Sequence, residues 1–309
     1  MKIDWRASVL NVAVHGDDCD GICSAALVLL KFPNAKIRFL NPRSIFTVDE
    51  EFDLVIDLPK PKKCKVNIDH HKSNLERLKK EGQLGPQDIV DPDAPASALL
   101  LMKYLNLEES KKAKEIVEIA VAADTARHTE ETLILDKIIK ASLNNEKDLL
   151  RIAKILAERG KNFLSDEWLK KKQKEIEAEL SKIKSFLKDF VDSLGVNSGF
   201  VIVDEIDAIP YHSTKDIAHM LLDRGCDAVA VLYRDASEPS KIRISIRVRR
   251  DSDVIDAEAI TRKFGGGGHK KAAGAITTDV KEAIFMLLKE FTGKSPTRSV
   301  VFIKLPKIL

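Results

Sequence analysis

Short apolar runs that end in acidic or imidazole side chains are the feature that most limits how this chain can fold. The runs cover residues 9–14, 54–56, 64–68 and 116–123, and helical stretches separate them. Continuous apolar runs are typical of parallel strands that are buried on both faces. The sequence therefore predicts an α/β fold whose N-terminal domain has a mainly parallel sheet with helices on both faces.

Hard ligands stand at the end of each run. Sites in parallel sheets form at the carboxyl ends of the strands, where a buried carboxylate is costly unless it is paired or binds a cation. Helix capping is a sufficient explanation for Asp20 or Asp124 taken alone, but it explains the four clusters together poorly. In chain order, the clusters are His15 with Asp18 and Asp20, then Asp57, then Asp69-His70-His71, and finally Asp124.

This set of side chains exceeds what one metal ion needs. Two divalent ions about 3.5–4 Å apart, bridged by a shared Asp, would use the carboxylates and the imidazoles. Mixed oxygen and nitrogen ligands suit manganese, and the chain has no thiolate quartet for structural zinc. The expected cofactor is therefore a pair of Mn²⁺ ions, with Mg²⁺ as the expected substitute.

The length of 309 residues predicts more than one domain. We expect a metal-binding domain over 1–150, a helical connector over 151–196 and a smaller mixed-sheet α/β domain over 197–309. Expected helices cover 130–141, 146–159, 166–194, 214–223, 257–264 and 280–291, and expected strands of the second domain cover 200–203, 228–233, 242–248 and 299–305.

The long helix expected at 166–194 carries an apolar stripe on a Lys- and Glu-rich surface. The spacing is mostly three and four residues, as a packed stripe requires. Either the domains cover this stripe or a second copy of the chain does, so a homo-oligomer is one expectation. The stripe consists of Leu164, Trp168, Ile176, Leu180, Ile183, Leu187, Val191 and Leu194.

A basic strand and a glycine run mark the second domain. Isoleucine and arginine alternate over 242–248, which places the basic residues on one strand face, although a solvated edge would show the same pattern. Gly266, Gly267 and Gly268 precede His269 and would leave backbone N–H groups open to phosphate oxygens. The competing interpretation of this run is a flexible linker.

These motifs resemble those of the DHH phosphoesterases. The resemblance rests on residues 15–21 (HGDDCDG), Asp57, Asp69-His70-His71 and residues 122–125 (AADT). Residues 265–274 (GGGGHKKAAG), with 242–247 (IRISIR) before them, are similar to the substrate-binding domain that accompanies DHH in RecJ-like exonucleases, nanoRNases and pAp phosphatases.

The resemblance implies a role for each motif residue. His15, Asp18 and Asp57 would hold one manganese, and Asp20, Asp57, His70 and Asp124 the other. Two residues separate His15 from Asp18 where many relatives have three or more, so the choice between Asp17 and Asp18 stays open. His71 would touch the scissile phosphate and Asp69 would orient the imidazoles, while Arg243, Ser245, Arg247, His269 and Lys271 would bind the terminal nucleotide.

The function that the resemblance implies is a manganese-dependent, single-strand-specific exonuclease of DNA or RNA that releases nucleoside monophosphates, with 3′–5′ polarity favoured. The alternatives are a nanoRNase or pAp phosphatase that acts on very short oligonucleotides, and a non-catalytic replisome scaffold. Replication or repair proteins are expected partners. A formal net charge of +3 does not by itself indicate nucleic acid, and four cysteines without a Cys-x-x-Cys pair predict a cytoplasmic location.

Overall fold

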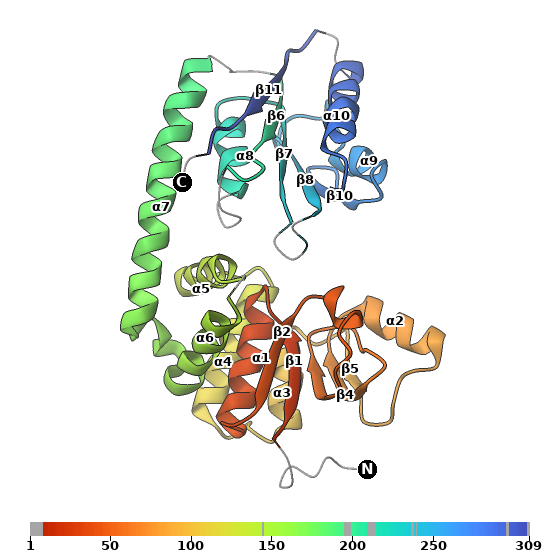
Figure 1. The fold of residues 1–309 in the computed structure, drawn as a ribbon, viewed down its shortest axis with the longest axis vertical. Helices are drawn as coiled ribbons and strands as arrows, with labels where there is room; N and C mark the ends of the chain where they lie inside the picture. Colours follow the sequence, from red (N-terminus) through yellow and green to blue (C-terminus); the bar gives the residue numbers. More distant parts are fainter. Residues whose placement is uncertain are drawn as a thin grey trace. The chain divides into compact units, whose positions relative to one another are not determined.

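The computed structural model divides the chain into two compact units, residues 1–176 and 177–309. It describes residues 9–143, 145–194, 199–208, 214–235, 238, 240–294 and 297–307. The boundary between the units falls inside one long helix (Figure 1). The expected connector over 151–196 is therefore divided between the two units.

The first unit contains a fully parallel five-stranded sheet with the order β2-β1-β3-β4-β5. The strand order reverses beside β1, which places the carboxyl ends of β1 and β3 next to each other. Parallel α/β sheets bind ligands at such a point. The strands are β1 (Asn11–His15), β2 (Lys36–Leu40), β3 (Phe52–Ile56), β4 (Cys64–Asp69) and β5 (Ile89–Val90).

Helix α1 (Cys19–Lys31) fills the centre of this unit. Its residues from Cys19 to Leu29 are all buried, and α3, α4 and α6 pack against it (Figure 1). The single-turn helix η1 (Ser44–Phe46) places Ile45 in a hydrophobic cluster with Ala13, Phe52 and Val55 of the sheet. The other helices are α2 (Lys72–Glu81), α3 (Ser97–Tyr104), α4 (Lys111–Asp124), α5 (Glu130–Ala141), α6 (Glu146–Arg159) and η2 (Gly160–Ser165).

The apolar run at 116–123 is a helix, contrary to its interpretation as a strand. It forms the second half of α4, whose buried positions Ala113, Ile116, Val117 and Ala120 recur at helical spacing. Burial on one stripe of a helix and burial of a short strand give similar runs in a sequence. Asp124 therefore ends a helix, whereas Asp57 follows a strand.

The second unit has a mixed six-stranded sheet with the order β11-β6-β7-β8-β10-β9. β11, β6 and β7 are parallel to one another, and the other neighbouring pairs are antiparallel. The α/β class expected for both domains is thus confirmed. The elements are β6 (Phe200–Asp204), α8 (Thr214–Asp223), β7 (Ala228–Arg234), β8 (Ile242–Val248), α9 (Ala257–Arg262), β9 (Gly267–His269), β10 (Ala272–Thr277), α10 (Val280–Lys294) and β11 (Val300–Lys304).

Helix α7 (Glu167–Leu194) buries three residues of its stripe, whereas Trp168, and Leu164 just before the helix, are half-buried. Ile176, Leu180 and Ile183 are all buried, and Ile183 packs into the core of the second unit with Val201. The side chains of Leu187, Val191 and Leu194 lie outside the described residues. The chain itself therefore covers these three residues, and the homo-oligomer stays a prediction.

Candidate metal centre

Asp57 is held in an unusual backbone conformation directly after β3. Its φ of 57° lies in the left-handed region, and its side chain is almost fully buried. The buried amide of Asn67 donates to the carbonyls of Val55 (3.1 Å) and Leu58 (3.0 Å), on either side of Asp57. Strained residues of this kind persist only where their surroundings fix them, and they gather at functional sites.

One cluster of possible ligands joins the end of β1 to Asp57. The Nδ1 atom of His15 lies 2.8 Å from Asp18 Oδ2 and 3.2 Å from Asp57 Oδ2. Asp18 is the N-cap of α1 and accepts the backbone N–H of Gly21 at 2.9 Å. Asp17 also contacts His15, since its Oδ1 lies 2.6 Å from His15 Nε2. Of the two aspartates, only Asp18 belongs to the cluster with Asp57.

Gly21 permits this tight arrangement. A Cβ atom on Gly21 would lie only 2.0 Å from the carbonyl oxygen of His15, so the first turn of α1 touches the end of β1. This contact explains why a glycine follows Asp20.

A second cluster surrounds His70. Its Nε2 atom lies 3.0 Å from Asp124 Oδ2, 3.6 Å from Asp57 Oδ1 and 3.9 Å from Asp20 Oδ2. The Nδ1 atom lies 3.2 Å from the carbonyl oxygen of Ala94. Because a carbonyl only accepts hydrogen bonds, Nδ1 carries a proton and Nε2 is the nitrogen left to bind a metal.

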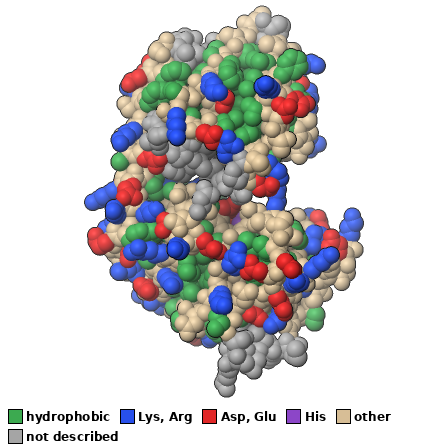
Figure 2. Space-filling view, viewed as in Figure 1, with side chains coloured by type: hydrophobic (Ala, Val, Ile, Leu, Met, Phe, Trp, Pro, Cys, Tyr) green, Lys and Arg blue, Asp and Glu red, His purple; other side chains and the backbone are tan. Residues whose placement is uncertain are grey.

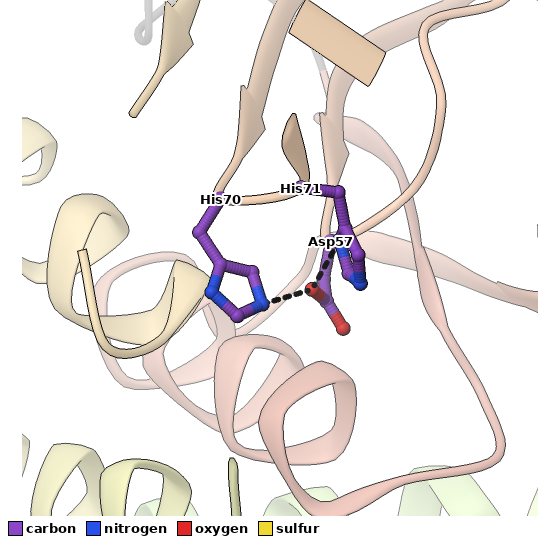
Figure 3. Close-up of side chains that lie close together, drawn as sticks. All are labelled: Asp57, His70 and His71. Atoms are coloured by element: carbon purple, nitrogen blue, oxygen red, sulfur yellow. Dashed lines mark ion pairs between the residues drawn. The ribbon is translucent and has the colours of Figure 1, made fainter. Parts of the chain in front are cut away.

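Asp57 groups with His15 and Asp18 on one side and with His70 and His71 on the other, and His70 in turn groups with Asp20 and Asp124. In Figure 3, the two imidazole rings come from the end of β4 and lie on either side of the Asp57 carboxylate. The two clusters coincide with the two ligand sets that the resemblance implies. The structure thus brings together His15, Asp18, Asp20, Asp57, His70 and Asp124, and their role as ligands stays a prediction.

Asp69 is fully buried and serves the neighbouring histidines. Its Oδ1 accepts the backbone N–H groups of His70 (2.8 Å) and His71 (3.2 Å) and lies 2.8 Å from His71 Nδ1. Its Oδ2 accepts the side-chain amide of Asn74 at 2.7 Å. A carboxylate with these neighbours holds the His71 ring with its Nδ1 as donor, so His71 Nε2 is left for other partners.

The electrostatics of the centre favour a bound cation. Among the described residues, the ion-pair partners of these ligand carboxylates are imidazoles and include no lysine or arginine. Burial and the Asp18 carboxylate raise the pKa of Asp57 to about 6, and burial with Asp57 and Asp18 raises the pKa of Asp20 well above its usual value. The hydrogen bond to Asp124 raises the pKa of His70 to about 9. Protons thus supply the positive charge that divalent ions would bring.

Thiolate ligation does not fit this centre. Cys19 lies between Asp18 and Asp20 in sequence, but its Sγ points to the carbonyl oxygen of Thr132 at 3.9 Å, and burial raises its pKa far above the usual value. The donor set is therefore carboxylate and imidazole, which fits manganese or magnesium better than structural zinc.

Four of the expected substrate residues, Arg243, Ser245, Arg247 and His269, lie on one face of the sheet of the second unit. Ile242, Ile244 and Ile246 face the core, whereas Arg243, Ser245 and Arg247 alternate with them and are half-buried. In the register of the strands, Arg247 of β8 pairs with Ala272 of β10, which pairs with His269 of β9. Paired residues share a sheet face, so Arg247 and His269 stand in one row.

The glycine run forms the edge strand β9 and the residues just before it, contrary to the competing interpretation as a flexible linker, and its binding of phosphate stays a prediction. A Cβ on Gly266 would lie 2.2 Å from the carbonyl oxygen of Gly274, and one on Gly268 would lie 2.6 Å from Ala273 Cα. Close packing against β10 therefore requires both glycines, whereas Gly267 faces open space. A glycine-rich strand gives no strand signal in a sequence, because glycine has low strand propensity.

Two expected substrate contacts are engaged within the chain. The ammonium of Lys271 contacts the carbonyl oxygen of Ser252 and lies 3.2 Å from Asp253 Oδ1. Arg243 Nε donates to Asp235 at 2.5 Å. These contacts tie neighbouring turns to the sheet, and substrate binding by either residue stays a prediction.

Comparison with known proteins agrees with this organisation. Residues 198–294 match the DHHA1 domain family. The solved structure of PggH, a pGpG-specific phosphodiesterase from Vibrio cholerae, is similar over 93% of this chain and 99% of its own, with a TM-score of 0.60 and 17% identity. RecJ from Thermus thermophilus in complex with Mn²⁺ is similar over 96% of this chain and 54% of its own, with a TM-score of 0.53 and 15% identity.

A third structure, exonuclease RecJ bound to manganese, is covered over 91% of its length at 14% identity and a TM-score of 0.51. A search of curated proteins found no match. The chain resembles the DHH phosphoesterases in its DHHA1 match over residues 198–294, its Asp69-His70-His71 motif and its fold. It spans about half the length of Thermus RecJ.

Proposed function

We propose that this chain is a two-ion phosphodiesterase that removes nucleoside monophosphates from the end of single-stranded DNA or RNA, as a manganese-dependent, RecJ-like exonuclease with 3′–5′ polarity favoured. One observation carries the proposal: Asp57 faces both clusters, with Oδ2 toward His15 and Oδ1 toward His70. His15 and Asp18 would hold one ion with Asp57. Asp20, His70 and Asp124 would hold the other with the same residue.

The chain's own residues divide the remaining work. When bound, two divalent ions would lower the pKa of a water molecule and stabilise the phosphate and leaving-group oxygens. The His71 side chain is 51% exposed, and its Nδ1 is bound to Asp69. The hydrogen bond to Asp69 raises the pKa of His71. In its doubly protonated form the ring would donate a hydrogen bond from Nε2 to the scissile phosphate, while Asp69 keeps the ring in that orientation.

The second unit would bind the terminal nucleotide. Arg247 and His269 supply a cationic side chain and an imidazole in one row of the sheet, and Gly267 leaves the backbone beside them open. Basic and acidic side chains are interspersed over the molecular face in Figure 2, in keeping with the small net charge. Affinity would then come from a few placed contacts and not from a broad basic surface.

A turnover assay tests the proposal. End-labelled 20-mers of DNA and RNA, and a labelled dinucleotide, are incubated with Mn²⁺ and with wild-type or Asp57→Ala protein. The wild type should release mononucleotides from the 20-mer, and Asp57→Ala should release none. Absence of turnover of every substrate by the wild type would favour the non-catalytic scaffold.

A second candidate is a phosphodiesterase of very short oligonucleotides. It is supported by the similarity to PggH, whose TM-score of 0.60 is higher than the 0.53 and 0.51 of the two RecJ structures. Degradation of the dinucleotide without degradation of the 20-mer would select this candidate. A homo-oligomer, and contacts with replication or repair proteins, stay predictions.

A further inference from the structure

Ser97 joins the carboxylates of the two clusters. It is the first residue of α3 and is fully buried. Its hydroxyl donates to Asp57 Oδ1 at 2.9 Å, and its backbone N–H donates to Asp20 Oδ2 at 2.6 Å. One residue therefore contacts the carboxylate shared by both proposed ion sites and a carboxylate of the second site alone.

The hydroxyl of Ser97 is not used to cap its own helix. The N-cap position of α3 is Ala96, which makes no side-chain cap, and the hydrogen-bond partner of the Ser97 hydroxyl is Asp57. The Asp20 carboxylate serves the helix end instead, since it accepts the N–H groups of Ser97 and Ala98 (2.9 Å). The hydroxyl thus has its polar contact in the metal centre.

The direction of this hydrogen bond fixes the Asp57 carboxylate. A carboxylate only accepts, so the Ser97 hydroxyl must be the donor. Its bond to Oδ1 opposes rotation of the carboxylate, whose Oδ2 lies 3.2 Å from His15 Nδ1. Without it, the carboxylate could turn about its last torsion, because that torsion has a broad energy well.

We propose that Ser97 is a positioning residue that orients the shared carboxylate of Asp57 and thereby couples the two ion sites. This inference rests on the proposed two-ion function. Residues that hydrogen-bond metal ligands commonly change metal affinity by about 10- to 100-fold when they are replaced. Loss of the Ser97 hydroxyl should weaken the binding of the two metal ions together, because Asp57 contributes to both sites.

Ser24 offers a matched control in the same unit. It is also fully buried, and its hydroxyl has no hydrogen-bond partner within the part of the chain that the structure describes. Ser24→Ala and Ser97→Ala remove the same atom from the buried interior of one unit, but only Ser97→Ala removes a hydrogen bond to a proposed ligand. A general effect of losing a buried hydroxyl would appear in both variants.

Manganese titration with electron paramagnetic resonance tests the inference. Wild type and Ser24→Ala should bind two Mn²⁺ ions per chain and give the signal of a magnetically coupled pair. Ser97→Ala should bind the second ion about 10- to 100-fold more weakly and give the signal of isolated ions. Thermal unfolding of the metal-free proteins checks that each variant is folded.

The outcomes separate the inference from the function on which it rests. A coupled pair of wild-type affinity in Ser97→Ala would overturn the positioning role and leave the two-ion function intact. A wild type that binds fewer than two ions would overturn the function and the inference together. If Ser97→Ala does not fold, Ser97→Cys keeps a similar shape with a weak donor, and an unchanged coupled pair there would equally overturn the inference.

Discussion

At the scale of single residues, the candidate centre depends on carboxylates whose burial is costly unless positive charge lies beside them. Asp20 and Asp57 are buried, and their contacts are imidazoles, backbone N–H groups and the Ser97 hydroxyl. Each of these partners binds one oxygen in a fixed direction. Such fixed directions would preorganise the carboxylates for the ions of the proposed centre.

His15→Ala should remove one of two bound manganese ions. His15 belongs to the cluster with Asp18 and Asp57 but not to the cluster around His70. Metal analysis after equilibrium dialysis should therefore find about half the wild-type manganese, with turnover reduced by at least about 100-fold. His128→Ala, at an exposed residue outside these clusters, is the control and should keep full occupancy. Full activity of His15→Ala would remove His15 from the ligand set.

The metal-free protein should become less stable as the pH rises. The pKa of His70 is raised from 6.5 to about 9 by Asp124, so its contribution to stability is complete below pH 6.5 and is lost as the pH rises through 9. The raised pKa of Asp57 acts in the same direction at lower pH, up to about 6. The melting temperature in the presence of a chelator should fall between pH 6.5 and 9, and Asp124→Ala should flatten this fall. A flat profile for the wild type would contradict the assignment.

At the scale of elements, the carboxyl ends of β1, β3 and β4 could be predicted from the sequence, because each apolar run stops at a polar ligand. Other contributions could not be predicted. Asn67, Asn74 and Ser97 are ordinary polar residues in the sequence, and only the register of β3 with β4 and the position of α3 show what they bind. Buried asparagines and serines have many possible partners, and nothing local selects one.

The second unit shows the same limit. The alternation in β8 correctly predicted that Arg243 and Arg247 share a face, because the strand period depends only on local geometry. Strand β9 was not predicted, because its glycines have low strand propensity and are required only by close contact with β10. The expected phosphate contact of Lys271 is also open to a simpler interpretation, because Ser252 and Asp253 already bind its ammonium.

Arg247→Ala should weaken substrate binding without removing metal. Arg247 lies in the row with His269, in the other compact unit from the ligand clusters. The apparent KM for a single-stranded substrate should rise, and the slope of log affinity against log salt should become shallower by about 0.7. Arg250→Ala, at an exposed residue just after β8, is the matched control and should change neither quantity. An unchanged KM and salt slope in Arg247→Ala would assign the row to structure alone.

At the scale of the whole molecule, α7 joins two units that each have their own sheet and core. Trp168, near the start of the helix, lies under the Arg151 guanidinium at 4.5 Å, and Ile183 packs in the core of the second unit. The helix was predicted from its stripe, but the stripe could not show what covers it. No helix in the described part of the chain is both long and apolar enough to cross a membrane.

Leu180→Glu should destabilise the protein and not simply dissociate an oligomer. Leu180 is 6% exposed within a single chain, so a buried charge at this position lacks solvation. We expect the free energy of unfolding, measured by urea titration, to fall by on the order of 3–5 kcal/mol at every protein concentration. Lys182→Glu, at an exposed position of the same helix, is the control. If the wild type is an oligomer and the variant is a folded monomer, the stripe would instead be a contact between two copies of the chain.

Anomalous diffraction from a crystal soaked in Mn²⁺ tests the central claim most directly. The account predicts two manganese peaks about 3.5–4 Å apart, with one oxygen of Asp57 on each. His15 and Asp18 should complete one site, and Asp20, His70 and Asp124 the other. A single peak, or two peaks that do not share Asp57, would contradict the two-ion centre.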